Sequence, residues 1–213
     1  MCPDERDMGM SRSRELLDLL EARWRQEGAP VHLAPGANED ELDDAEGRLG
    51  FALPQEVRDR FGWHNGHDED SVDPDVFMFP IRVFPGNLQE SIDERAELLA
   101  DQDRRRGAGD EDESGRSFQP TWLAITQPAK RTIVADCSDG AQDRRAPAPI
   151  HVVHHWGERP WDTVLMPSLT AMLEVWWQLS EAGIWAFNPD GSGDWVIQNE
   201  EIPADLRKTG LFS

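Results

Sequence analysis

Residues 49–66 read LGFALPQEVRDRFGWHNG, and this stretch decides how the chain around it is arranged. Gly50 can adopt the left-handed conformation that ends a preceding helix. Pro54 suits the first position of a following helix, because the amide proton that proline lacks has no acceptor there. Val57 and Phe61 lie four residues apart and share one face of that short helix, and the closing Asn-Gly pair is typical of a turn. The stretch predicts a structural corner without a reaction centre.

Two amphipathic helices are predicted on the N-terminal side of this corner. Leu16, Leu20 and Trp24 recur every four residues, as the buried side chains of a helix do, and a glycine follows where this helix would end. Asn38 and Glu41 have the spacing of a capping box and predict the start of the second helix. The buried positions expected on that helix are Leu42, Ala45 and Leu49.

The C-terminal side of the corner predicts a short strand, a long helix, three more strands, another helix, a hairpin and a last short helix. The long helix begins at the capping pair Asn87 and Glu90, and Ser168 can cap the later helix. A loop of hairpin length joins the first two strands after the long helix, which favours antiparallel pairing. The expected strands are 76–79, 122–125, 132–136, 150–153, 184–187 and 195–198. The buried face of the long helix is expected to hold Leu88, Ile92, Ala96 and Leu99, and that of the later helix Leu169, Met172, Leu173 and Trp176. A last helix is expected over 202–208.

The order of these motifs resembles the Smi/Knr-like proteins, the fungal cell-wall assembly regulators and their bacterial relatives that form the SUKH superfamily. The Leu-Pro and Asn-Gly landmarks lie in the corner, and the resemblance covers residues 36–180. The later landmarks are a Trp-Leu-x-Ile strand (Trp122, Leu123, Ile125), a strand ending in aspartate (Ile133, Val134, Asp136), a strand over 150–153 and a helix begun at Pro167, Ser168 and Leu169. The resemblance implies that the chain acts as many bacterial members do, as a cytoplasmic immunity protein that binds and blocks a toxin, commonly a nuclease.

The pattern of helices and strands predicts one α+β domain of the Smi/Knr-like SUKH type over residues 11–213. Its central sheet is expected to be mainly antiparallel, with surrounding helices, several of them N-terminal. Residues 1–10 are acidic and aperiodic, and we expect a disordered tail there. Residues 101–117 carry charges and glycines but almost no apolar side chains, so they cannot offset the entropy of ordering. We expect a disordered acidic loop at these positions, inside the domain.

The charge balance argues against nucleic-acid and membrane partners. Asp and Glu outnumber Lys and Arg by 42 to 21, which gives a formal net charge of -21. Such a surface repels phosphates and anionic lipids and attracts basic proteins, although acidity can also serve solubility alone. The two cysteines, Cys2 and Cys137, do not suggest a disulfide framework, and no basic leader with an apolar run opens the chain. These features favour the cytoplasm.

Candidates for catalysis and metal binding are few. No nucleophile-elbow, phosphate-loop, C-x-x-C or H-E-x-x-H motif is present, and no sequence feature places a base beside Cys137. His151 and His155 share one face of a strand, but a zinc site needs three or four ligands. Asp136 and Cys137 are conceivable additions from a neighbouring strand. We expect no bound metal and no cofactor, and a metal-dependent hydrolase using these histidines is kept as an alternative.

Two loops carry residues suited to a protein interface. The acidic stretch HDEDSVDPD, residues 67–75, lacks the glycine and the terminal glutamate of a calcium loop. The stretch HHWGERPW, residues 154–161, holds tryptophans that would anchor a contact if they do not belong to the core. The predicted partner-binding residues are Asp68, Glu69, Asp70, Asp73, Asp75, Trp156, Glu158 and Trp161.

The predicted function is a non-enzymatic protein-binding module with a basic protein partner. The resemblance makes an immunity protein that neutralises a toxin the leading hypothesis, and the net charge of -21 agrees with a basic toxin such as a nuclease. A regulatory scaffold of the cell-wall-regulator type is the first alternative. The metal-dependent hydrolase is the second.

Overall fold

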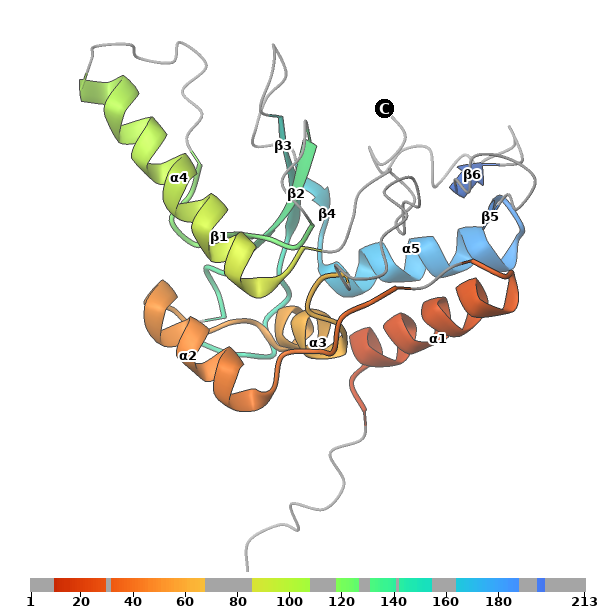
Figure 1. Ribbon diagram of the computed structural model, residues 1–213. Coiled ribbons are helices and arrows are strands. Elements are labelled where there is room, and N and C mark those ends of the chain that lie inside the picture. Colours follow the sequence, from red (N-terminus) through yellow and green to blue (C-terminus); the bar gives the residue numbers. More distant parts are fainter. Residues whose placement is uncertain are drawn as a thin grey trace, which may run out of the picture.

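The computed structural model describes residues 10–29, 32–67, 86–107, 118–126, 131–140, 142–154, 164–187 and 195–197. The elements within them are α1 (Arg12–Gln26), α2 (Glu39–Leu49), α3 (Gln55–Trp63), α4 (Leu88–Gly107), β1 (Trp122–Ala124), β2 (Arg131–Asp136), β3 (Ile150–His154), β4 (Val164–Met166), α5 (Leu169–Glu181), β5 (Trp185–Phe187) and β6 (Trp195–Ile197). The first four strands form an antiparallel sheet in sequence order, and the last two form a separate antiparallel hairpin (Figure 1). The predicted α+β class with a mainly antiparallel sheet is confirmed.

Local capping explains where α2 and α3 begin and end. The Asn38 side chain accepts a hydrogen bond from the Glu41 amide at 3.0 Å, and the Glu41 carboxylate accepts one from the Asn38 amide at 2.8 Å, which is the predicted capping box. Gly50 ends α2 with a φ of 79°, where glycine has no Cβ penalty. Pro54 precedes α3 instead of occupying its first position. Its ψ of 148° is extended, so the helix begins one residue later than predicted, at Gln55.

The helical core lies between α1, α3 and α5. Figure 1 shows α1 and α5 side by side, and α3 contacts both. The predicted buried positions are confirmed for Leu16, Leu20, Trp24, Leu42, Ala45, Leu49, Val57, Phe61, Leu169, Met172, Leu173 and Trp176. Trp24 meets Trp185 edge to face with ring centroids 5.9 Å apart, so aromatic packing attaches β5 to α1.

Both faces of the sheet are covered along β1 to β3. On one face Leu123, Ile133 and Ile150 join the helical core. The other face carries a second apolar cluster, against which α4 packs. Its buried members are Phe118, Trp122, Ala124, Val134 and Val153, and the α4 side chains packed on them are Leu98 and Leu99. The described residues therefore leave these three strands without an exposed apolar face.

The α4 helix is longer than the sequence predicted. The disordered loop expected over 101–117 begins inside this helix, which continues to Gly107. Asp101 pairs with Arg104 at 3.1 Å and with Arg105 at 2.7 Å. The charges that suggested a loop thus form i,i+3 and i,i+4 pairs on one helical face, which stabilise a helix even where apolar residues are lacking.

Other sequence predictions differ from the structure in smaller ways or are not tested by it. Ala96 is exposed, although the sequence predicted it on the buried face of α4. β4 was not predicted, because a strand of three residues is too short to show an alternating pattern. The tail up to residue 9, the strand over 76–79, the loop remainder over 108–117 and the helix over 202–208 lie outside the described residues.

Candidate partner-binding groove

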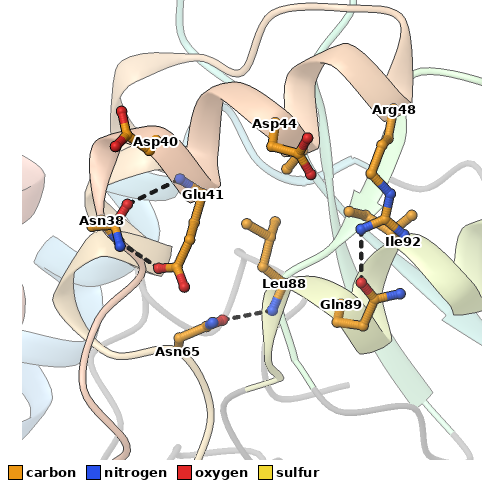
Figure 2. Close-up of a pocket in the computed structure, with 10 residues that line it drawn as sticks. Asn38, Asp40, Glu41, Asp44, Arg48, Asn65, Leu88, Gln89 and Ile92 are labelled. Atoms are coloured by element: carbon orange, nitrogen blue, oxygen red, sulfur yellow. Dashed lines mark hydrogen bonds between the residues drawn. The ribbon is translucent and has the colours of Figure 1, made fainter.

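A groove lies between α2 and α4 and encloses about 440 Å³. Figure 2 shows α2 along its upper side, α4 below, and Asn65 at one end. Ala45, Leu88 and Ile92 are buried and form its apolar floor. The polar residues around the floor are Asn38, Asp40, Glu41, Asp44, Arg48, Asn65 and Gln89. The groove thus combines an apolar base with a charged rim.

One row of acidic side chains on α2 is paired with an arginine within the protein. Arg58 of α3 lies 2.5 Å from Glu39, 2.9 Å from Asp43 and 2.9 Å from Glu46. The Arg58 side chain is only 5% exposed. Burial disfavours its charged form, but the hydrogen bonds that Arg58 donates to the three carboxylates outweigh this effect and raise the pKa of Arg58. This cluster attaches α2 to α3, and each of its three acids has a cationic partner within the protein.

A second row of acidic side chains on α2 faces the groove. Asp40 and Asp44 are four residues apart, and both are exposed. No cation in the described part of the chain pairs with either carboxylate. The helix dipole accounts for an acid in the first turn of α2, such as Asp40, but Asp44 lies a full turn further on. The groove rim therefore carries negative charges that are not paired with any cation in the described part of the chain.

The opposite end of the rim carries a cation. Arg48 Nη1 donates to the Gln89 side-chain oxygen at 2.7 Å, and Gln89 Nε2 donates to the Asp93 carboxylate at 2.8 Å (Figure 2 shows the first of these bonds). No carboxylate among the described residues contacts Arg48 directly. Along α2 the groove thus runs from free carboxylates to a guanidinium group that is bonded only to a neutral amide.

The Asn65 end of the groove is also where the predicted acidic loop joins the described chain. The Asn65 side chain accepts from the Leu88 amide at 2.6 Å, and so helps to cap α4. Gly66 has a φ of 94°, and a Cβ at this position would lie 3.0 Å from the Asn87 Cβ, so the close approach requires glycine. Gly66 and Asn87, which flank the segment 68–85, are therefore held close together beside the groove.

A buried arginine fixes the same corner of the molecule. Arg60 is 2% exposed and donates to the carbonyl oxygens of His64 at 2.6 Å, Gly86 at 3.1 Å and Ile125 at 3.1 Å. Burial lowers the pKa of Arg60 to about 9. One side chain thus joins the end of α3, the residue before Asn87 and the end of β1. The sequence analysis placed only Val57 and Phe61 on the inner face of α3 and did not predict the burial of Arg60, although its spacing of three from Val57 was a signal.

The structure does not test the partner-binding residues that the sequence predicted. All eight lie in the segments 68–85 and 155–163, outside the described residues: Asp68, Glu69, Asp70, Asp73, Asp75, Trp156, Glu158 and Trp161. The groove itself was not predicted. Its signal in the sequence is the pair Asp40 and Asp44, whose spacing puts them on a different face of α2 from the buried Leu42 and Leu49.

The residues proposed for metal or nucleophilic chemistry have structural surroundings where they are described. His151 is 7% exposed and stacks on Trp122 with ring centroids 4.5 Å apart. Cys137 is buried and donates to the Ala135 carbonyl oxygen at 3.7 Å, and burial raises the pKa of its thiol far above the ordinary value. In the described ranges no three His, Cys, Asp or Glu side chains gather as a metal site would require. His155 lies outside those ranges.

The chain matches no protein-family model, and a search of the curated proteins finds no similar sequence. The resemblance to the SUKH superfamily rests on the landmarks in the sequence and stays a prediction. Across the described segments, no helix has both the length and the apolar character needed to cross a bilayer.

Proposed function

We propose that the chain is a cytoplasmic, non-enzymatic module that binds a basic protein at the α2–α4 groove and thereby neutralises it. The observation that supports this proposal is the contrast between the two rows of acids on α2. The row beside Arg58 is paired within the protein, whereas Asp40 and Asp44 on the groove rim have no cationic partner among the described residues.

Two properties of the groove suit a protein partner. A net charge of -21 accelerates the encounter with a basic surface, and the rim charges orient it. The apolar floor at Leu88 and Ile92 can cover the aliphatic stem of a lysine or arginine side chain while its head meets the carboxylates. A specific interface covers about 800 Å² on each partner, so the groove would be one part of a larger contact. The predicted acidic residues of the adjoining segment are candidates for the rest.

The neutralising role rests on the resemblance to the SUKH superfamily, whose bacterial members often bind toxins. A nuclease must carry cations where it holds phosphates, so a chain with a charge of -21 complements it. A regulatory scaffold would use the same groove for a different partner. The two roles differ in whether binding blocks an activity of the partner.

The test takes as candidate partner any basic protein whose gene neighbours the gene for this chain. Its dissociation constant is measured by calorimetry with the wild type, with Asp40→Asn/Asp44→Asn and with Glu97→Gln/Asp103→Asn as a matched control. The control removes two exposed carboxylates of α4 that lie outside the groove and have no described partner. We expect the groove variant to bind about three- to tenfold more weakly, and the control to change by less than about twofold.

Loss of the partner's toxic activity on binding supports immunity, and binding without such a loss supports the scaffold. A wild-type chain that does not bind the basic protein contradicts the proposed function. Equal weakening by the two variants contradicts the assignment to the groove.

A further inference from the structure

We propose that the groove recognises a bipolar segment of its partner: a cationic side chain at the Asp40 and Asp44 end, and a carboxylate at the Arg48 end. This inference rests on the proposed function and adds the chemistry and spacing of the segment that is bound. The groove offers both signs of charge, and its apolar floor lies between them.

The charges on the rim do not neutralise each other, although their spacing would allow it. Asp44 and Arg48 stand at i,i+4 with the acid on the N-terminal side, the favourable order for a helical ion pair. Arg48 instead turns to Gln89 across the groove (Figure 2). Each charge is therefore presented separately to a molecule in the groove.

Arg48 can bind a carboxylate without giving up the bond that orients it. A guanidinium group has five N–H donors, and the described contacts of Arg48 use one donor atom, Nη1, toward Gln89. Gln89 is held in turn by Asp93 through bonds of 2.8 and 2.9 Å. The arginine is thus positioned in advance, which lowers the entropic cost of binding an anion.

The spacing along α2 sets the spacing expected in the partner. Asp40 and Arg48 are eight residues apart, so at 1.5 Å per residue their backbones are separated by roughly 12 Å. An extended chain covers about 13 Å in four residues. A segment of the form Lys-x-x-x-Glu, with apolar side chains between the charges, would place its middle on Leu88 and Ile92.

The experiment titrates the full chain with blocked pentapeptides and follows backbone amide shifts by NMR. Four peptides share an Ala-Leu-Ala centre and carry Lys and Glu, Lys and Gln, Gln and Glu, or Gln and Gln at their ends. Concentrations reach about 10 mM, which detects dissociation constants in the millimolar range. The chains are the wild type, Asp40→Asn/Asp44→Asn, Arg48→Gln, Arg48→Lys and the control Glu97→Gln/Asp103→Asn.

We expect the Lys and Glu peptide to bind most tightly, with each charge contributing about two- to fivefold. Shifts should map to Leu88, Gln89 and Ile92. The Asp40→Asn/Asp44→Asn variant should lose the preference for lysine only, and Arg48→Gln should lose the preference for glutamate only. Arg48→Lys should keep part of the glutamate preference because it keeps the charge, and the control should behave as the wild type.

The inference is overturned if no peptide titrates, if the shifts map elsewhere, or if glutamate adds nothing to binding. These outcomes are distinct from failure of the proposed function. A basic protein partner that binds through Asp40 and Asp44 but is unaffected by Arg48→Gln would leave the function standing and remove the bipolar segment. A chain that binds the peptides as expected but binds no basic protein would remove the function.

Discussion

Single buried carboxylates connect elements that lie far apart in the sequence. Glu56, in the first turn of α3, accepts hydrogen bonds from the backbone amides of Ala148 at 2.6 Å, Leu169 at 3.2 Å and Thr170 at 2.8 Å. It also accepts from the Thr170 hydroxyl at 2.6 Å. The carboxylate therefore caps the start of α5 and holds it to α3 and to the residues before β3. A charged acceptor at a helix N-terminus is favoured by the helix dipole as well.

Replacing Glu56 with Gln tests this role. The amide group can accept at only one of its two ends, so at least one buried N–H group loses its acceptor. We expect a loss of about 2 to 3 kcal/mol in the free energy of unfolding, measured by urea denaturation. Glu174→Gln is the control, because the Glu174 side chain is 46% exposed and pairs only loosely with Arg12 at 3.5 Å. Equal losses in the two variants would show that the carboxylate of Glu56 is not needed.

Glu21 gives a pH-dependent test at the same scale. Burial raises its pKa, but hydrogen bonds from Arg25 at 2.6 Å and from His64 at 3.0 Å outweigh this effect, so the pKa of Glu21 lies below its ordinary value of 4.5. Because the folded value is the lower one, ionised Glu21 stabilises the fold above pH 4.5. That contribution is lost as the pH falls through the folded value.

The expected result for Glu21→Gln is therefore a loss of about 1 kcal/mol at neutral pH, reduced by solvent screening of this partly exposed group. The difference from the wild type should shrink as denaturation is repeated toward about pH 3. Asp18→Asn, which removes a half-buried acid paired with Arg14, serves as the control. A difference that stays constant with pH would mean that Glu21 does not stabilise the fold through its charge.

Among the elements, α3 depends most on its neighbours. A helix of nine residues is not stable alone in water, so its stability must come from packing. Val57 and Phe61 are 0% exposed, and the charged residues Glu56, Arg58 and Arg60 are buried as well. Glu56 connects α3 to α5, Arg58 connects it to α2, and Arg60 connects it to Gly86, shortly before α4.

Phe61→Ala should lower the free energy of unfolding by roughly 3 to 5 kcal/mol, because it leaves a cavity in a fully buried site. Gln55→Ala, at an exposed position of the same helix, should change stability by less than about 0.5 kcal/mol. Both values follow from chemical denaturation of the full chain. A loss below about 1 kcal/mol for Phe61→Ala would show that this helix face is assigned wrongly.

Local signals made most of the elements predictable. The box at Asn38 and Glu41, the left-handed Gly50 and the cap at Ser168 depend on residues within one helical turn, so the sequence displays them directly. The spacing of Arg60 from Val57 hints at its burial, but no local pattern shows the partners of Arg58 and Arg60, which come from α2, from the end of β1 and from Gly86. The extension of α4 was not predicted, because the lack of apolar residues after residue 100 indicated a loop. The i,i+3 and i,i+4 pairs of Asp101 with Arg104 and Arg105 favour a helix there instead.

At the scale of the whole molecule, position distinguishes the acids that support the fold from those offered to a partner. The chain has 42 acidic and 21 basic residues, which indicates an acidic surface. These numbers cannot say which carboxylates form ion pairs or hydrogen bonds within the fold. Glu46 pairs with Arg58 and Arg144, and Glu56 accepts hydrogen bonds from backbone amides. Asp40 and Asp44 face the groove, and this assignment needed the packing of α2 on α3 and α4.

The central claim is that the rim of the α2–α4 groove meets the basic partner, and association kinetics at two ionic strengths test it most directly. Asp40→Asn/Asp44→Asn should slow association at low salt and flatten its salt dependence, because rim charges act mainly through steering. Glu97→Gln/Asp103→Asn removes the same formal charge outside the groove and should have a clearly smaller effect on both quantities. If the two variants have the same association rates and the same salt slopes, the groove is not where the partner binds.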